Sequence, residues 1–220
     1  MSASFLKILA CFFMLIDHIG FCFFPRLSIL RIIGRLAFPI FAYQIATGFK
    51  LTSNRKKYFF RIALFALISQ IPYAIFRDVS GYSSFSLNIG FTFVIAFVAL
   101  LFAELAKKKN FLYIFLITPL LPLATVLNVD YKWYGVLLIV LFYLFDIKNI
   151  KEFPLLLFAV TALSFAYVTL SSSSSLQYYA MLSLIILAFA NGKKGFNLKY
   201  LFYVFYPLHM LILSLIKFLI

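Results

Sequence analysis

The sequence predicts an all-α membrane protein, a polytopic bundle of about nine transmembrane helices in a single domain that covers residues 1–220. Of its 220 residues, 65% are apolar and only 12% are charged, and the mean hydropathy is +1.06. Soluble domains average about 25% charged residues, so a water-exposed surface cannot be assembled from this composition. The apolar residues gather in runs that approach the roughly 20 residues needed to cross a hydrocarbon core. No gap between the runs is long enough to hold a second domain.

The apolar runs are separated by short polar or basic gaps, and each run is expected to form one helix. The first run is kept as a membrane helix, because it contains Asp17 and His18 and lacks the small-residue exit of a cleaved signal peptide. Several runs are short, so we expect tilted helices or helices at uneven depth. The expected helices cover residues 5–24, 32–49, 58–76, 89–106, 111–127, 133–147, 153–170, 176–190 and 200–220.

Glycines and prolines are expected to shape the second and the last of these helices. Gly34, Pro39 and Gly48 fall in the second run, where small or kinked positions let helices approach one another. Pro207 in the last run weakens the local hydrogen-bond ladder and frees a backbone carbonyl, which is a common way to shape a cavity. The serine run at residues 171–175 is expected to be a polar turn. The aromatic residues are expected to face lipid and fill the core, and none is assigned to a cofactor.

The gaps alternate between many and few basic residues, and this alternation predicts the topology. The cation-rich gaps hold five Lys and Arg at residues 50–61, three at 107–109, two at 148–151 and three at 193–199. Cytoplasmic connections retain positive charge, so we expect the N-terminus and Lys7 inside and the C-terminus outside. Together with Lys7, the four gaps place 14 of the 20 cations inside. The net charge of +14 is then a topology signal. We therefore expect a lipid bilayer as partner and no nucleic acid, and a multi-pass protein of a bacterial plasma membrane.

Three arginines oppose this topology. Arg26, Arg31 and Arg35 lie between the first and second runs, on the side expected to be external. Arg35 falls within or at the edge of the hydrocarbon, where an unpaired cation is costly, so an anionic group should meet these side chains. We expect Asp17 to pair with Arg31 or Arg35. Arg26, Arg31 and the intramembrane amide Gln44 are candidate contacts for a substrate, although Gln44 is equally consistent with hydrogen bonding between helices.

The only two histidines, His18 and His209, both fall inside apolar runs, at depths roughly one helical turn apart. Ionisable groups at such depth are candidate functional residues by default. An imidazole has an ordinary pKa of about 6.5, so it can take a proton from an amine or a hydroxyl at neutral pH. The neighbouring Asp17 points about 100° away around the helix and is expected to turn toward the arginines, while His18 faces the reaction. The structural alternative is a buried clasp of Asp17, His18 and Arg35 that only holds two helices together.

The basic gap at residues 50–61 offers candidate ligands for the phosphates of a cofactor. We assign Arg55, Lys56, Lys57 and Arg61 to this role, and Arg61 is notable because it lies inside a predicted helix. The alternative is that these side chains serve only topology and contact anionic lipid.

The cysteine content excludes a disulfide framework and gives no metal site. Cys11 and Cys22 are the only cysteines, and a single helix would separate them by roughly 16 Å. No metal cofactor is therefore expected.

Several motifs, taken together, resemble the TraX family. The resemblance is dense over roughly the first 75 residues, good over the last 20, and elsewhere a matter of hydropathy. The motifs are LK at 6–7, MLIDHIG at 14–20, FFP at 23–25, IGRLAFPIFA at 33–42, GF at 48–49, SQIPY at 69–73 and FYPLH at 205–209.

The resemblance implies a multi-pass acyltransferase, since the founding TraX protein acetylates the amino terminus of a conjugative pilin. The chain is also similar to the membrane acyltransferase type 3 group, in which the first helix carries a catalytic histidine near its extracytoplasmic end. In that group the second helix ends in Gly-Phe and an arginine-containing inner segment follows. His18, the pair Gly48 and Phe49, and residues 55–61 match that plan. Nothing in the sequence indicates a pilin context, so the acceptor stays open.

These observations together predict transfer of an acetyl or other short acyl group from cytoplasmic acetyl-CoA or another acyl-CoA to an extracytoplasmic amine or hydroxyl. The acceptor would be a peptide N-terminus, a glycan or an envelope polymer. His18 is expected to act as general base, with Arg35 or Arg31 stabilising the oxyanion, while His209 relays a proton or bonds to His18 or the acceptor. One alternative is a small transporter or lipid-handling protein that uses the same Asp, His and Arg side chains. Another is a scaffold subunit, in which neither histidine would line a cavity.

Overall fold

The computed structural model describes residues 1–171, 174–198 and 200–220, and its regular elements within these ranges are helices, apart from one isolated β-bridge between Leu87 and Val129. The predicted all-α class is therefore confirmed. Two details of the sequence analysis lie outside the described residues, namely residues 172–173 of the expected serine turn and Lys199 of the last basic gap.

Over the described residues, six helical segments are long and apolar enough to cross a membrane. They are α1 (Ala3–Cys22), the consecutive pair α2 (Ser28–Gly34) and α3 (Ala37–Leu51), α4 (Arg55–Val79), α5 (Ile89–Lys108), α8 (Phe153–Leu170) and α10 (Leu201–Leu219). Three further apolar segments are shorter. They are the 3-10 helix η1 (Phe111–Ile117) with α6 (Leu120–Val126), then α7 (Lys132–Leu144), and the 3-10 helix η2 (Ser175–Leu182) with α9 (Ser183–Ala188).

The prediction of nine transmembrane helices is not confirmed, although every predicted run coincides with helical structure. The α7 helix has 13 residues. At about 1.5 Å per residue it is roughly 20 Å long, against a hydrocarbon core of about 30 Å. Hydropathy counts apolar residues and does not register where helices are interrupted. Pro119, for example, lies between η1 and α6 and divides the fifth predicted helix into two short pieces.

Short polar side chains fix where several of the helices begin. Ser2 Oγ accepts a hydrogen bond from the backbone N–H of Phe5 at the start of α1. Asn54 Oδ1 accepts one from the N–H of Lys57 at 2.8 Å at the start of α4, and Asn88 caps α5 in the same way. Each cap satisfies a first-turn amide that has no partner within its helix, so the polar gaps become the helix boundaries.

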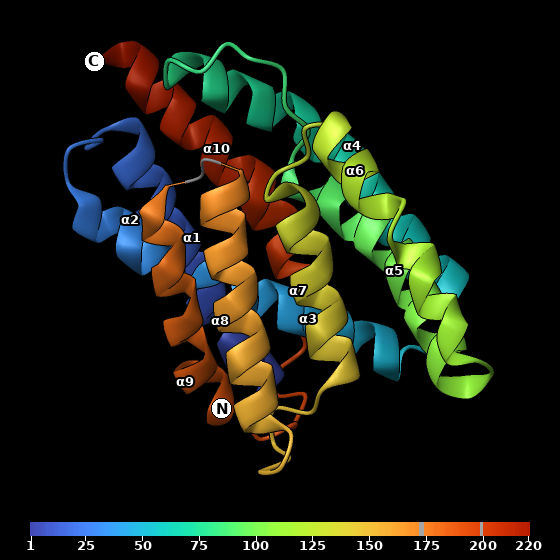
Figure 1. Ribbon diagram of the computed structural model, residues 1–220. Helices are drawn as coiled ribbons and strands as arrows, with labels where there is room; N and C mark the ends of the chain where they lie inside the picture. Colours follow the sequence, from blue (N-terminus) through green and yellow to red (C-terminus); the bar gives the residue numbers. More distant parts are fainter. Residues whose placement is uncertain (172–173, 199) are drawn as a thin grey trace.

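Helices from the two ends of the chain pack together in the bundle (Figure 1). The α1 helix packs against α2, α3 and α10, and α10 also packs along α4. The α7 helix contacts α3, α5 and α8, and its Tyr134, Leu138 and Ile139 are fully buried. Because α1 and α10 are in contact, residues far apart in sequence can form one site.

The N- and C-termini lie at opposite ends of the bundle (Figure 1). The cation-rich gaps lie at the end of the bundle where the N-terminus lies (Figure 1). The backbone N–H of Ala3 donates to the carbonyl of Lys193 at 2.9 Å, and Lys107 Nζ donates to the carbonyl of Leu144 at 3.0 Å. We call this the basic end and the other the far end, where the loops at 23–27, 80–88 and 127–131 lie. Which end faces the cytoplasm stays a prediction.

Candidate functional site

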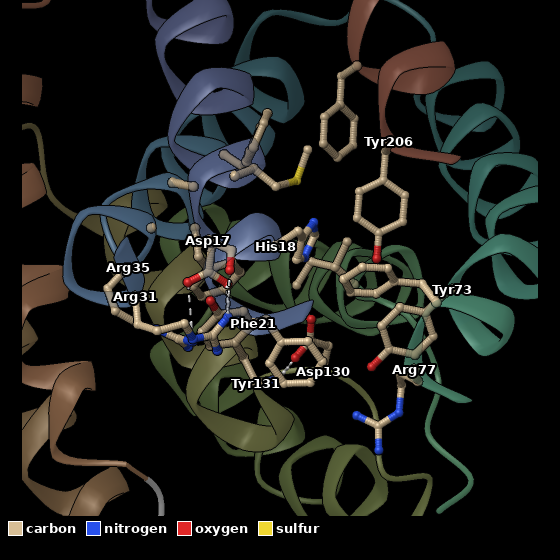
Figure 2. Close-up of a pocket in the computed structure, with 18 of the residues that line it drawn as sticks. Asp17, His18, Phe21, Arg31, Arg35, Tyr73, Arg77, Asp130, Tyr131 and Tyr206 are labelled. Atoms are coloured by element: carbon tan, nitrogen blue, oxygen red, sulfur yellow. Dashed lines mark hydrogen bonds and ion pairs between the residues drawn. The ribbon is translucent and has the colours of Figure 1, made fainter. Parts of the chain in front are cut away.

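A cavity of about 140 Å³ lies inside the bundle toward the far end (Figure 2). This volume is close to that of a cavity which holds one benzene molecule, so it admits only a small chemical group. The α1 helix contributes Asp17 and His18, while α2 and the break before α3 contribute Arg31 and Arg35. The other polar side chains of the lining are Tyr73, Arg77, Asp130, Tyr131 and Tyr206.

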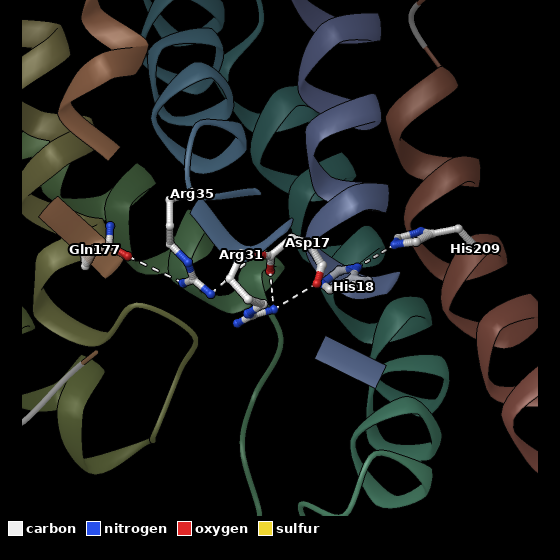
Figure 3. Close-up of polar contacts among 6 residues, drawn as sticks. All are labelled: Asp17, His18, Arg31, Arg35, Gln177 and His209. Carbon is white, nitrogen blue, oxygen red and sulfur yellow. Dashed lines mark hydrogen bonds and ion pairs between the residues drawn. The ribbon is translucent and has the colours of Figure 1, made fainter. Parts of the chain in front are cut away.

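The two histidines, which lie 191 positions apart in the chain, are in direct contact. His18 Nδ1 lies 2.6 Å from His209 Nε2 (Figure 3). His209 is only 5% exposed and lies behind His18, with its ring stacked on Phe205 at 4.7 Å between centroids. His18, in contrast, lines the cavity. The predicted proximity of the two imidazoles in depth is confirmed, and His209 reaches the cavity through His18.

Hydrogen bonding fixes the tautomers of this pair. His209 Nδ1 lies 2.7 Å from the carbonyl oxygen of Phe205, and because a carbonyl only accepts, His209 Nδ1 carries a proton. His209 Nε2 is then an acceptor, and His18 Nδ1 donates to it. A neutral His18 consequently has its lone pair on Nε2, the nitrogen that would act as a base. The partner that sets the tautomer of His18 is therefore His209 and not Asp17.

Asp17 is the anionic group that contacts the arginines opposing the predicted topology. Its Oδ2 accepts a bond from Arg31 Nη1 at 2.8 Å, and its Oδ1 lies 3.4 Å from Arg35 Nη2 (Figure 3). Arg35 Nη1 also donates to Gln177 Oε1 at 3.5 Å, and Arg35 Nε is buried without a hydrogen-bond partner among the described residues. The predicted ion pair is confirmed. It links α1 to the segment from α2 to α3, as the clasp alternative proposed, but His18 is not part of it.

Gly34 allows the close approach that places this ion pair. A Cβ atom at Gly34 would lie 2.2 Å from Cβ and Oδ1 of Asp17. Any side chain there would push α2 away from α1, because real Cβ contacts are never so short. The glycine in the Gly-Arg pair therefore sets the distance between the carboxylate and the guanidinium groups.

The cavity also contains two charged side chains that the sequence analysis did not assign to the site, Asp130 and Arg77. Asp130 lies in the turn between α6 and α7, where its Oδ1 accepts a bond from the N–H of Tyr131 at 3.1 Å. Burial raises the pKa of the Asp130 carboxyl to about 6. Arg77 donates to Ser84 Oγ at 2.9 Å, and in the part of the chain that the structure describes its buried Nε has no hydrogen-bond partner. No sequence signal near either residue indicates a shared cavity, because their distance depends on how the loops fold.

Two more cavities lie between this site and the basic end. One of about 210 Å³ shares Phe41, Phe93 and Phe202 with the histidine cavity, so these three rings border both cavities. The Phe202 ring lies 4.4 Å from that of Phe41 and 6.3 Å from that of Phe93, between centroids. A third cavity, also of about 210 Å³, shares Lys7 and Gln44 with the second and is lined by residues near the N-terminus and by Lys194. The three cavities form a series along the bundle, from the basic end to His18.

Comparison with known proteins identifies the family. The sequence model of the TraX protein family matches residues 2–217. The chain belongs to the TraX family. It is 29% identical over 238 residues to the probable fimbrial assembly protein FimC, serogroup H1, of Dichelobacter nodosus. The alignment covers 98% of this chain and 96% of that relative. It is 42% identical over 66 residues to the uncharacterized protein RP591 of Rickettsia prowazekii (strain Madrid E), over 30% of this chain and 25% of that relative. No solved structure gives a significant match.

Within this TraX protein, the four residues assigned to cofactor binding have different surroundings. Arg55 forms an ion pair with Glu104, with Nη1 and Oε2 2.8 Å apart, and its guanidinium lies 3.7 Å from the ring centroid of Phe49. Lys56 and Lys57 are exposed. Arg61 lines the second cavity, and its buried Nε has no hydrogen-bond partner within residues 1–171, 174–198 and 200–220. Among these four residues, only Arg61 faces the cavity series.

The residues assigned to substrate binding are also separated in this TraX protein. Arg31 lines the histidine cavity, whereas Arg26 is exposed in the loop before α2. Gln44 lies on α3 near the basic end, where its Nε2 donates to the carbonyl of Ala3 at 3.3 Å. Its place in the second and third cavities puts Gln44 on the side of the phenylalanine rings away from His18.

Proposed function

We propose that this TraX protein is a membrane-embedded acyltransferase of the bacterial plasma membrane. It would transfer an acetyl or other short acyl group from acyl-CoA to a nucleophile that enters at the far end. The observation that carries the proposal is the histidine pair at the end of a series of cavities, with a base nitrogen available and the guanidinium groups of Arg31 and Arg35 in the same cavity.

The chemistry follows from the positions of these groups. His18 Nε2 takes a proton from the acceptor, whose nitrogen or oxygen attacks the thioester carbonyl. Arg31 or Arg35 stabilises the negative charge that develops on the carbonyl oxygen. The C–S bond then breaks, and the CoA thiolate leaves and takes the proton from His18. His209 holds the His18 ring in the productive tautomer throughout and accepts from its Nδ1–H.

The cavity series supports delivery of the donor from the basic end. The phosphates of CoA are too strongly charged to enter the bundle, so they would stay near Lys7, Lys194 and Arg61, where basic side chains border the second and third cavities. The narrow pantetheine arm would pass the rings of Phe41 and Phe202 to bring the thioester to His18. Compared with the sequence-based assignment, this places Arg61 in contact with the donor and gives Arg55 a structural role in its ion pair with Glu104.

The FimC relative bears on the acceptor. That protein is described as a probable fimbrial assembly protein, and it aligns with almost the whole of this chain. A membrane acyltransferase that works with surface appendages would have an envelope polypeptide or polymer as its acceptor. We extend this class of acceptor to the present chain.

The alternatives make different predictions. A small transporter is favoured by the same series of cavities, and it would move a substrate in the absence of acyl-CoA. A scaffold subunit is disfavoured, because His18 lines a cavity.

The decisive experiment is acyl transfer by purified protein in lipid nanodiscs supplied with acetyl-CoA and simple amine or alcohol acceptors. Release of free CoA thiol and formation of acetylated product are measured together. We expect His18→Ala to lower the transfer rate about 100-fold or more, since general-base catalysis contributes about 10²–10⁴-fold. Phe158→Ala is the matched control, because Phe158 on α8 is 70% exposed and distant from the site in sequence and contact. A folded His18→Ala variant with full activity would refute the assignment, and substrate flux without acyl-CoA would favour the transporter.

A further inference from the structure

The lining of the histidine cavity contains three buried polar atoms that form no hydrogen bond with the residues that the structure describes. They are Arg35 Nε, Arg77 Nε and the hydroxyl oxygen of Tyr206. Both guanidinium nitrogens can only donate hydrogen bonds, and the phenol carries a proton to donate. A buried polar group without a partner is costly, and native structures keep few of them. The cavity is therefore matched to a group that accepts hydrogen bonds, such as a carbonyl oxygen.

Tyr206 is the neutral donor of this set, and it is almost completely buried. The residue is 2% exposed, and its hydroxyl extends from α10 toward the middle of the cavity (Figure 2). The backbone N–H of Ile89, in the first turn of α5, interacts weakly with the phenol oxygen. Because an N–H group is itself a donor, it cannot take the phenol proton. The proton of Tyr206 is consequently available to a ligand.

The rings around Tyr206 place its hydroxyl on the route assigned to the acyl donor. Phe202 lies four positions earlier on α10, about one turn toward the basic end, and its ring centroid is 5.7 Å from that of Tyr206. Phe202 borders both the second cavity and the histidine cavity. A pantetheine arm that passes Phe202 would therefore bring its thioester to Tyr206 and His18 together.

The same helix supports the base. Tyr206 and His209 are three positions apart on α10, with their ring centroids at 6.0 Å, and His209 holds His18 through the 2.6 Å contact. The arginines lie on α2 and the break before α3, where Asp17 contacts both guanidinium groups. Their positive charge is thus partly neutralised before any substrate enters, whereas the hydroxyl of Tyr206 has no such competitor.

We propose that Tyr206 is a catalytic residue whose hydroxyl donates a hydrogen bond to the carbonyl oxygen of the thioester. This inference rests on the proposed acyltransferase function and adds a residue that touches the acyl donor. The bond strengthens as negative charge develops on the carbonyl oxygen, so it stabilises the transition state more than the bound donor. The guanidinium groups contribute their charge from the opposite wall.

The step balances without any further reactant. The acceptor gives its proton to His18 Nε2, and its lone pair forms a bond to the thioester carbon while the π electrons of the carbonyl move to the oxygen. Tyr206 donates a hydrogen bond to this oxyanion and keeps its proton. The carbonyl then re-forms, the C–S bond breaks, and the CoA thiolate takes the proton from His18.

The test combines two probes with two variants. One probe is the ketone analogue of acetyl-CoA in which a methylene group replaces the thioester sulfur, and the other is its alkyl counterpart without the carbonyl oxygen. Binding of each probe to the full-length protein in nanodiscs is measured by calorimetry, and acetyl transfer and the melting temperature are measured separately. Tyr206→Phe removes only the hydroxyl. Tyr134→Phe is the matched control, because Tyr134 is a fully buried tyrosine outside the cavity lining, with its hydroxyl 3.3 Å from Ser164 Oγ.

We expect the wild type to bind the ketone probe about three- to tenfold more tightly than the alkyl probe, which is the gain that one neutral hydrogen bond gives. Tyr206→Phe should remove this preference and lower kcat for acetyl transfer about 100-fold, the usual cost of losing one oxyanion donor. Its melting temperature should not fall, because the lost hydroxyl has no partner in the free protein. Tyr134→Phe should show the opposite pattern, with wild-type transfer and a lower melting temperature.

The outcomes separate this inference from the proposed function. Wild-type kcat in Tyr206→Phe, or equal binding of the two probes by the wild type, would overturn the role of Tyr206, and the first result would leave the acyltransferase reaction standing. A lower melting temperature of Tyr206→Phe with the probe preference intact would show that the hydroxyl is structural and would also overturn it. A Tyr206-dependent preference for the ketone probe with no acetyl transfer by the wild type would keep the carbonyl site and reject the reaction.

Discussion

Replacement of His209 tests whether it sets the tautomer of His18. His209→Phe keeps an aromatic ring in the pocket beside Phe205 but removes the acceptor that lies 2.6 Å from His18 Nδ1. A buried donor left without a partner costs about 1–3 kcal/mol. Without this acceptor the Nδ1–H tautomer of His18 is no longer favoured. In the Nε2–H tautomer the nitrogen that faces the cavity carries the proton and cannot act as the base. At about 1.4 kcal/mol per factor of ten, kcat should fall about 5- to 150-fold.

The assay is steady-state acetyl transfer with the acceptor concentration varied. Because His209 does not line the cavity, the KM for the acceptor should stay near its wild-type value while kcat falls. His209→Gln is the conservative comparison, since its amide can accept from His18 and donate to the Phe205 carbonyl, and it should retain more activity than His209→Phe. Wild-type kcat in a folded His209→Phe variant, or a change confined to KM, would refute the tautomer argument.

Three further predictions follow from the structure. Phe202→Ala removes a ring that borders both the second cavity and the histidine cavity, so a longer acyl chain should fit. The ratio of butyryl to acetyl transfer should rise about tenfold when the two CoA thioesters compete. Leu208→Ala, which changes an exposed residue of the same helix, should leave this ratio unchanged. Gly34→Ala would place a Cβ atom 2.2 Å from Asp17, and such overpacking should lower the free energy of unfolding by about 1–3 kcal/mol. The melting temperature should fall accordingly, and an unchanged melting temperature would contradict the close approach of the two helices. Burial raises the pKa of the Asp130 carboxyl to about 6 in the folded protein, above the value of about 4 in the unfolded chain. The folded state therefore holds this proton more tightly than the unfolded state, and the free energy of unfolding falls as pH rises from about 4 to 6. Asp130→Asn should therefore raise the melting temperature at pH 8 and have little effect near pH 4, and the opposite order would show that the carboxylate is stabilised as an anion.

Part of the site was predictable from sequence because membrane physics makes ionisable residues conspicuous. Asp17, His18 and His209 stand out inside apolar runs, and the arginines stand out because they oppose the topology rule. Their mutual distances follow from a few helix contacts, so the ion pair of Asp17 with Arg31 and the meeting of the two imidazoles could be anticipated.

The rest depended on tertiary structure that carries no local signal. Asp130 lies beside a lysine in a polar turn, and only the folding of that turn onto residues 86–92 shows that it enters the cavity. Arg55 resembles a phosphate ligand in sequence, but Glu104, 49 positions away, neutralises it. The number of full membrane crossings could not be predicted from hydropathy either. Residues such as Pro119 divide apolar runs into helices too short to span a membrane.

The ring cluster of Phe41, Phe93 and Phe202 has a consequence for the cell that contains the protein. A bacterium stores energy as a proton gradient, and any continuous thread of water through a membrane protein discharges it. Apolar rings in mutual contact interrupt such a thread, since water loses its hydrogen bonds between them. If the proposed function holds, the protein would receive its donor on one side and its acceptor on the other, and these rings would keep it impermeable to protons between turnovers.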